Sequence, residues 1–275
     1  MLSIEEEETT IEEAVEEAVE EAVDERTQIL NQDLIPSINP SYFLKEETAR
    51  FSTAGWFNAL SRVRVSLLGV GGIGSYVAYL LSRLGINRMD IWDMDILESV
   101  NMSGQLHSAM YIGQPKVRAM VELLRIICNN FNINAVEARF IEGSGIYPIV
   151  ICGFDNMVAR KNAFNTWVKQ HKESPTPLEY LFIDGRLAAE EFQVYCVQGG
   201  NLEQIEQYKE TLFTDAEAEE TVCSYKQTAF CANMIASVMV NCLINFLYNA
   251  NETIFERPVP YFTRYSAETM IFKTE

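Results

Sequence analysis

The sequence has little of what a zinc-binding protein needs. It contains only two histidines, and none of its six cysteines forms a C-x-x-C pair, so no spacing for a tetrahedral zinc site is present and no zinc is expected. Cysteines within apolar runs are typical of ordinary buried thiols, which favours a reducing, cytoplasmic setting. The six are Cys128, Cys152, Cys196, Cys223, Cys231 and Cys242.

Positive charge and long apolar runs are also scarce. The formal net charge is −18, of which twelve acids and one Arg in residues 1–26 give −11, leaving −7 for residues 27–275. This balance argues against nucleic acid or an anionic membrane as the main partner. We expect no stretch to be apolar for long enough to span a membrane, and the acidic N-terminus is unlike a secretory or mitochondrial signal.

Three regions follow from composition. Residues 1–30 form an acidic low-complexity segment with E-E-A-V repeats, either a solvated tail or a helix that docks on a partner. Residues 31–62 are expected to form a connector and a short helix, because prolines interrupt the first half. Residues 63–275 are expected to form one domain with a packed core.

The domain alternates between strand and helix patterns. This alternation predicts an α/β fold, with a doubly wound, Rossmann-like, mostly parallel sheet and antiparallel C-terminal strands. The helix predicted over 228–248 is apolar all round, so we expect it in the core or in a homodimer interface. The other strands are expected over 63–68, 89–92, 135–140, 148–152, 180–183, 192–197, 261–265 and 270–272, and the other helices over 54–62, 75–84, 116–129, 155–171 and 202–212.

A glycine turn after the first predicted strand indicates a nucleotide site. Apolar residues 65–68 lead into Gly69, Gly71, Gly72 and Gly74, and a helical pattern follows. Glycines let the backbone approach a phosphate, and a helix N-terminus supplies free N–H groups. Asp93 lies at the end of the next strand, about twenty residues on, where an acid can bind ribose hydroxyls. This motif alone would also fit a dinucleotide-dependent oxidoreductase.

More particular motifs follow the glycine turn. In order, they are D-M-D (Asp93 and Asp95), N-M-S-G-Q (Asn101 to Gln105), I-G-Q-P-K ending at Lys116, and D-N-x-x-x-R from Asp155 to Arg160. Over about residues 60–250 this pattern resembles the ThiF/MoeB/ubiquitin-activating enzyme family, with its G-x-G-G-x-G, D-x-D, N-x-x-R-Q, G-x-x-K and D-N-x-x-x-R motifs. The later I-D-G-R, ending at Arg186, is also similar to that family.

The resemblance implies ATP- and Mg²⁺-dependent adenylation of a C-terminal carboxylate. The activated partner would be a small ubiquitin-like or sulfur-carrier protein ending in Gly, or a peptide. A homodimer is expected through the last long helix, because a helix that is apolar all round needs a second surface. Lys116 would be a mobile ammonium that meets phosphate oxygens, and Asp155 a hard oxygen ligand for Mg²⁺. Arg160 would orient Asp155 or the acyl phosphate. Asp95, Asn101 and Gln105 are carried over as nucleotide-binding positions.

Two features leave alternatives open. Gly104 stands where the family motif has an arginine, so a nucleotide-binding scaffold without turnover is the second hypothesis, and NAD-dependent redox chemistry the third. Cys223 precedes the last long helix, as in small activating enzymes that form a thioester there, and an inert loop cysteine is the alternative. Asp155 can also be a helix N-cap, and an Asp184–Arg186 pair can be structural.

Overall fold

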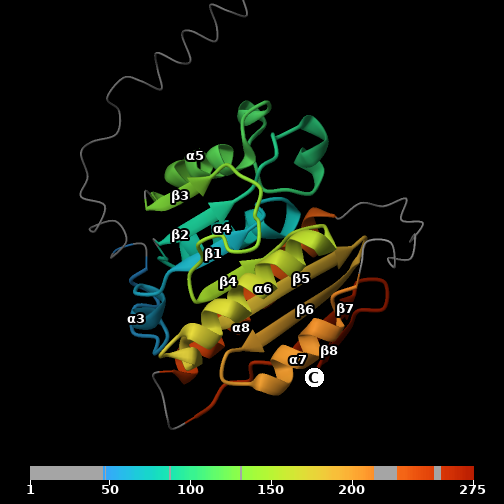
Figure 1. Ribbon diagram of the computed structural model, residues 1–275. Helices are drawn as coiled ribbons and strands as arrows, with labels where there is room; N and C mark the ends of the chain where they lie inside the picture. Colours follow the sequence, from blue (N-terminus) through green and yellow to red (C-terminus); the bar gives the residue numbers. More distant parts are fainter. Residues whose placement is uncertain (1–45, 47, 87, 131, 214–227, 251–254) are drawn as a thin grey trace, which may run out of the picture. The chain divides into compact units, whose positions relative to one another are not determined.

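The computed structural model describes residues 46, 48–86, 88–130, 132–213, 228–250 and 255–275, all within one compact unit, Phe43–Glu275 (Figure 1). Its helices are α3 (Phe57–Leu60), α4 (Gly72–Arg83), α5 (Lys116–Cys128), α6 (Met157–Glu173), α7 (Leu202–Glu210) and α8 (Ala229–Asn249), with 3-10 helices η1 (Ser99–Ser103), η2 (Ala109–Tyr111) and η3 (Pro177–Glu179). Its strands are β1 (Val65–Leu68), β2 (Met89–Trp92), β3 (Ile133–Val136), β4 (Ile149–Cys152), β5 (Leu181–Ala188), β6 (Glu191–Gln198), β7 (Phe262–Ser266) and β8 (Ile271–Thr274).

The described strands form one eight-stranded sheet in the order β3-β2-β1-β4-β5-β6-β7-β8. The neighbours from β3 to β5 pair in parallel, and β5 to β8 pair antiparallel. This confirms the predicted doubly wound sheet with antiparallel C-terminal strands. The prediction of 135–140 placed the start of β3 two residues too late and its end four residues too late. Among the described strands β3 pairs with β2 alone, and this pairing ends where Trp92 meets Val136, so the chain beyond Val136 has no strand to continue on.

The neighbouring strands β1 and β4 are buried on both faces. Leu67 on β1 belongs to a core shared with α4, α5 and α8, whereas Leu68 belongs to a second core shared with α6 and α7. Alternation along β4 divides Ile151 and Cys152 between the same two cores. Since successive side chains of a strand point to opposite faces, four apolar residues in a row are what a strand covered on both sides requires. In Figure 1, α6 and α7 cover the same face of the sheet.

Helix α8 is long and apolar enough to pass a length-and-composition test for a membrane span, so the expectation that no stretch would do so was wrong. Of its most apolar 18-residue stretch, 56% is buried, and the helix packs against α4, β5 and β6. A Cβ at Gly185 on β5 would lie 2.6 Å from Sδ of Met239, which explains the glycine there. Of the two expected positions for this helix, the structure shows packing in the core, and the homodimer interface stays a prediction.

Candidate functional site

The glycine turn joins β1 to α4 at the carboxyl end of the sheet. Gly69 has φ +87°, a conformation that glycine adopts without strain. Gly71 is the N-cap of α4 and provides no side-chain cap, so the first amides of the helix are left for a ligand. A Cβ at Gly74 would overlap the carbonyl oxygen of Gly69, so this glycine permits the close packing of helix on turn. The turn therefore has the local geometry of an anion-binding loop.

A cavity of about 710 Å³ opens beside this turn. It lies along the carboxyl ends of β1, β2, β4 and β5, where ligands bind in open α/β sheets. Asn101 and Gly74 do not line it, and Cys223 lies outside the residues that the structure describes. The predicted residues that do line it are Gly69, Gly71, Gly72, Asp93, Asp95, Gln105, Lys116, Asp155 and Arg160.

The D-M-D motif holds the turn and the lysine in place. Asp93 accepts hydrogen bonds at Oδ2 from the N–H of Val70 and at Oδ1 from the N–H of Asp95, both at 2.9 Å. Burial raises the pKa of Asp93, against the lowering effect of these two bonds. Lys116 Nζ lies 2.8 Å from Asp95 Oδ2, with only 9% of its side chain exposed. The ammonium is therefore fixed by Asp95, and the expectation of a mobile lysine was wrong.

The segment after β2 is fastened over the glycine turn. The N–H of Leu106 donates to Ser75 Oγ (2.9 Å), and His107 Nε2 lies 3.0 Å from the carbonyl oxygen of Val70. Between these anchors and η1, Gln105 reaches the cavity, and its buried Oε1 has no hydrogen-bond partner among the described residues. A buried acceptor without a donor is costly, so this amide fits a ligand that brings a donor.

Asn101 and Gly104 belong to the turn that carries Gln105. Asn101 Oδ1 accepts from the N–H of Glu98 (2.9 Å) in a capping box, which ties Asn101 to the backbone of η1. Gly104 is buried and ends η1. Asn101 thus shapes the loop, and position 104 offers no side chain to the cavity.

Asp155 follows β4 and is exposed at the cavity. The N-cap of α6 is Asn156, whose Oδ1 accepts from the N–H of Ala159 (2.8 Å), so Asp155 is not the cap. Its Oδ1 accepts a 3.3 Å hydrogen bond from Asn156 Nδ2. No cluster of three or more metal-ligating side chains occurs in the described part of the chain. Asp155 therefore fits a Mg²⁺ ion that takes its other ligands from phosphates and water.

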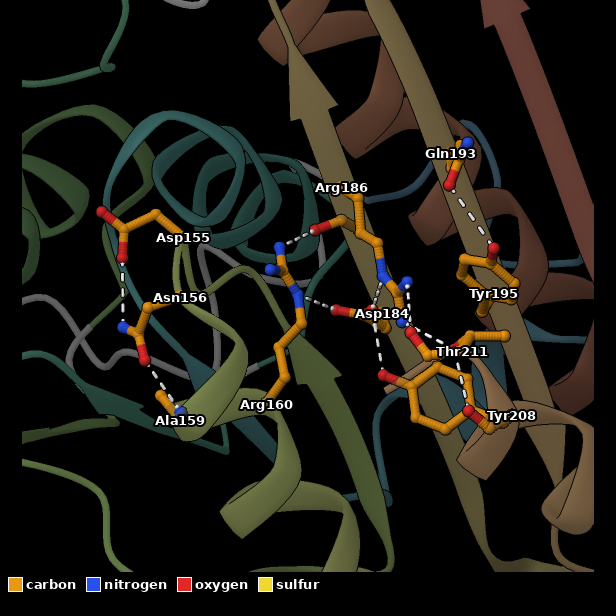
Figure 2. A network of polar contacts seen from close by, with 11 residues as sticks. Asp155, Asn156, Ala159, Arg160, Asp184, Arg186, Gln193, Tyr195, Tyr208 and Thr211 are labelled. Atoms are coloured by element: carbon orange, nitrogen blue, oxygen red, sulfur yellow. Dashed lines mark hydrogen bonds and ion pairs between the residues drawn. The ribbon is translucent and has the colours of Figure 1, made fainter. Parts of the chain in front are cut away.

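Arg160 does not approach Asp155 through a hydrogen bond. Figure 2 shows its guanidinium directed at Asp184: Nε lies 3.0 Å from Oδ1, and a second nitrogen donates to the carbonyl oxygen of Gly185 (3.1 Å). Arg186 Nε lies 2.7 Å from Asp184 Oδ2, to which the hydroxyl of Tyr208 also donates (2.9 Å). The two arginines outweigh burial and lower the pKa of Asp184. Of the two roles expected for Arg160, the structure shows no contact with Asp155. The role toward the acyl phosphate stays a prediction.

The sequence did not identify several residues of the cavity wall. Arg139 comes from the loop after β3, and Gln193 from the middle of β6. Phe154 and Phe213 add aromatic surface. Phe154 directly precedes the D-N-x-x-x-R motif, whereas Arg139, Gln193 and Phe213 belong to no local motif and are brought to the cavity by the order of the strands.

The comparisons with known proteins agree with this geometry. Ubiquitin-like modifier-activating enzyme 5 of Culex quinquefasciatus is 31% identical over 121 residues, which are 38% of this chain and 30% of the relative. Adenylyltransferase and sulfurtransferase MOCS3-1 of Zea mays is 33% identical over 109 residues, 37% of this chain and 23% of the relative. The matched stretch thus spans less than a third of each of these relatives.

Among solved structures, E. coli MccB, crystallised with ATP, has the same fold, with a TM-score of 0.62 at 16% identity over 88% of this chain and 73% of that one. The same protein has also been crystallised with MccA. The family model described as the ThiF family matches residues 45–274, which is most of the described chain and includes every wall of the cavity. The chain therefore belongs to the ThiF family.

Proposed function

We propose that this protein uses ATP and Mg²⁺ to adenylate the C-terminal carboxylate of a partner protein or peptide. The observation that carries this proposal is the arrangement of the cavity, which gathers the glycine turn, Asp93, Lys116 and Asp155 along the carboxyl ends of three neighbouring strands. Its volume of about 710 Å³ lies within the usual range for a small-molecule site.

Each residue has a role that its surroundings support. The uncapped amides of α4 would bind phosphate oxygens. Asp93 retains lone pairs for ribose hydroxyls after accepting two backbone bonds. Lys116, held by Asp95, would meet phosphate from a fixed position, which avoids the entropic cost of ordering a free lysine. Asp155 would hold Mg²⁺ together with the phosphates, where the metal would neutralise developing charge.

The reaction is an attack of the carboxylate on the α-phosphate, giving an acyl adenylate and pyrophosphate. It needs little proton transfer, so the contribution of the protein is positioning and charge stabilisation. The relative from Zea mays carries the name adenylyltransferase, and MccB has been crystallised with ATP, which supports this reaction class. For the partner we propose a ubiquitin-like or sulfur-carrier protein ending in Gly, or a peptide, with the enzyme a cytoplasmic homodimer.

Thioester formation on Cys223 is the optional second step of this proposal. The described cysteines, Cys128, Cys152, Cys196, Cys231 and Cys242, are all buried, and burial raises the pKa of the Cys152 thiol to about 12. A thioester would therefore form on Cys223 in preference to these. We expect a Cys223→Ser variant to lose an adduct that hydroxylamine cleaves, whereas a Cys231→Ser variant keeps it. Loss of the adduct in Cys231→Ser alone would contradict the assignment.

ATP–pyrophosphate exchange tests the first step, with and without small proteins ending in Gly-Gly. We expect partner-dependent exchange that falls at least 100-fold in Lys116→Ala and in Asp155→Ala, on the scale of other charge-stabilising groups. Lys161→Ala, an exposed lysine outside the cavity, is the matched control and should leave the exchange rate unchanged. Exchange that survives both cavity variants would contradict the proposal.

The missing side chain at Gly104 supports a second candidate, a nucleotide-binding scaffold without turnover. Tight ATP binding without pyrophosphate exchange would favour it, and Gly104→Arg would then be expected to restore exchange. An NAD-dependent oxidoreductase is a weaker alternative. It predicts that the protein binds NADH and that Lys116→Ala leaves the affinity for NADH unchanged.

A further inference from the structure

The glycine turn suits an anion only if its carbonyl oxygens are directed away from the site. Free N–H groups attract a phosphate, whereas a carbonyl oxygen in the same place repels it. The carbonyl oxygen of Gly71 accepts the N–H of Ser75 at 3.0 Å, at the start of α4. The carbonyl oxygen of Gly69 lies against Gly74, where a Cβ would be 1.8 Å from it. These two carbonyls are therefore fixed by the turn and the helix that follows it.

The third carbonyl of the turn, that of Val70, is held by a side chain from another segment. His107 Nε2 lies 3.0 Å from the carbonyl oxygen. The N–H of Val70 donates to Asp93 Oδ2 at 2.9 Å, so one side chain holds the peptide group on each side of this residue. His107 and Asp93 thus set the orientation of the backbone that leads into α4.

The contacts of His107 define where its proton lies. A carbonyl oxygen only accepts, so Nε2 is the nitrogen that carries the proton. The residue is only 8% exposed, and its Nδ1 is buried without a hydrogen-bond partner among the described residues. A proton on Nδ1 would have no acceptor in this dry position. The ring is therefore the neutral Nε2–H tautomer.

The charges around the ring favour the same neutral form. Burial lowers the pKa of His107, and the Lys116 ammonium of α5 lowers it further, against the raising effect of the bond to Val70. Asp95 is paired with Lys116, and Asp93 accepts the N–H of Val70, so neither carboxylate forms an ion pair with the imidazole. A neutral donor thus holds the carbonyl without placing a cation in the core.

His107 also connects the turn to the loop that carries Gln105. The N–H of His107 donates to the carbonyl oxygen of Gln105 at 3.1 Å, and the Gln105 side chain lines the cavity. The imidazole itself does not line the cavity. His107 therefore acts on a ligand through Val70 and Gln105 and not by direct contact.

We propose that His107 is a positioning residue for nucleotide binding. As the neutral Nε2–H tautomer, it holds the carbonyl of Val70 away from the phosphate site, so that the turn presents only N–H groups to an anion. Without this hydrogen bond, the peptide group between Val70 and Gly71 is free to turn its oxygen toward the phosphates. The identity of the nucleotide as ATP rests on the proposed function.

Two substitutions of His107 separate the roles of its nitrogens. The amide nitrogen of Gln reaches about as far as Nε2, so His107→Gln keeps a donor for Val70. The amide nitrogen of Asn corresponds to Nδ1, so His107→Asn leaves the carbonyl without a donor. The matched control is His171→Gln, at the second histidine of the chain, which is also buried and lies outside the cavity.

The first measurement is the affinity of the folded proteins for Mg-ATP by calorimetry. His107→Gln and His171→Gln should bind within about threefold of wild type. His107→Asn should bind about tenfold more weakly, which is the effect of one lost hydrogen bond. In the exchange assay its KM for ATP should rise while the maximal rate changes less than about twofold. A lower Tm for His107→Asn with unchanged ATP affinity would show a purely structural role and overturn the proposal.

Failure of the adenylation reaction would give a different result. If exchange is absent but the four proteins keep this order of ATP affinities, adenylation is overturned and the role of His107 is supported. If wild type does not bind ATP, the rise in Tm with inorganic phosphate tests the turn by itself. The same order of the four proteins would then support the role, and equal rises would overturn it.

The protonation of His107 gives two further readouts. In long-range nitrogen–proton spectra, the histidine signals that disappear in His107→Gln should be those of an Nε2–H tautomer, and an Nδ1–H tautomer would overturn the proposal. Because the native pKa is lowered, the stability that the neutral ring contributes is complete above its unfolded pKa of about 6.5 and is lost as the pH falls toward the native value. The free energy of unfolding of wild type should therefore fall more steeply in acid than that of His107→Gln, and parallel curves would overturn the neutral form.

Discussion

Replacing Asp184 with Asn should destabilise the protein more than any other single change in the polar network that Figure 2 shows. The carboxylate accepts three hydrogen bonds, from Arg160 (3.0 Å), Arg186 (2.7 Å) and Tyr208 (2.9 Å), in a fully buried position. Asn has nearly the same shape, so the change removes charge while leaving packing almost intact. The two guanidinium groups would then remain buried without a counter-charge.

The size of the effect follows from this arrangement. Removing one partner of a buried ion pair costs roughly 3–5 kcal/mol, because it leaves an uncompensated buried charge. For a domain of this size, a change of that magnitude lowers Tm by about 6–20 °C. Tyr208→Phe is the graded control, since it removes one hydrogen bond to the same carboxylate and should cost about 1.5–3 kcal/mol.

The pH dependence provides a second signature. The native pKa of Asp184 is lowered by Arg160 and Arg186, so the unfolded state binds a proton more readily than the native state. The stability that the carboxylate contributes is therefore complete above its unfolded pKa of about 3.9 and is lost as the pH falls through the native value. The difference in the free energy of unfolding between wild type and Asp184→Asn should be constant from about pH 5 to 8. It should become smaller only in acid.

Urea unfolding followed by tryptophan fluorescence measures both effects. Trp167 lies in the same hydrophobic core as Tyr208, and its ring centre is 5.8 Å from that of Phe182. A free energy of unfolding for Asp184→Asn within about 1 kcal/mol of wild type at pH 7 would refute the reasoning, since such a value is typical of an exposed ion pair. If the difference in the free energy of unfolding already becomes smaller at neutral pH, the lowered pKa of Asp184 is refuted.

Two further predictions concern the glycine turn. Gly74→Ala should weaken ATP binding at least tenfold and lower Tm, because the added Cβ would displace the carbonyl of Gly69. Gly145 has open space around it, so Gly145→Ala should match wild type in calorimetry and thermal unfolding. Ser75→Ala should raise the KM for ATP several-fold and lower the free energy of unfolding by about 1 kcal/mol. The reason is that the N–H of Leu106 loses the acceptor that fastens the Gln105 loop to α4. An unchanged KM in the exchange assay would contradict this role.

The core elements were predictable because their patterns are local. Strands β1 and β2 each have three apolar residues out of four, and both lie within two residues of the prediction. Helix α4 begins three residues earlier than predicted, since its first turn contains Gly72 and Gly74, which have poor helix propensity and carry no apolar periodicity. The 3-10 helices η1 and η2 were not predicted, because such short turns give no periodic signal.

The candidate site also has a part that local motifs predict and a part that they do not. Its nucleotide side is built from short motifs, such as the glycine turn and D-M-D, and within D-M-D the N–H of Asp95 donates to Asp93 two residues before it. The contacts of charged groups were harder to predict, because a sequence does not show which partner a lysine or arginine takes. Lys116 pairs with Asp95, 21 residues away, and Arg160 with Asp184, 24 residues away.

The wall of the cavity that no local motif forms is the one that we expect to select the carboxylate partner. On the β5 side, the cavity is lined by Arg186 of β5, Gln193 of β6 and Phe213 of the segment after α7. Antiparallel pairing and the packing of α7 on β6 bring them together. The nucleotide is common to every reaction of an adenylating enzyme, whereas the carboxylate is what distinguishes one from another. Residues that contact the carboxylate partner should therefore lie on the side of the cavity without a local motif. Substitution of Gln193 or Phe213 should change the choice of partner while ATP affinity stays within about twofold, and an equal loss of both would place these residues with the nucleotide instead.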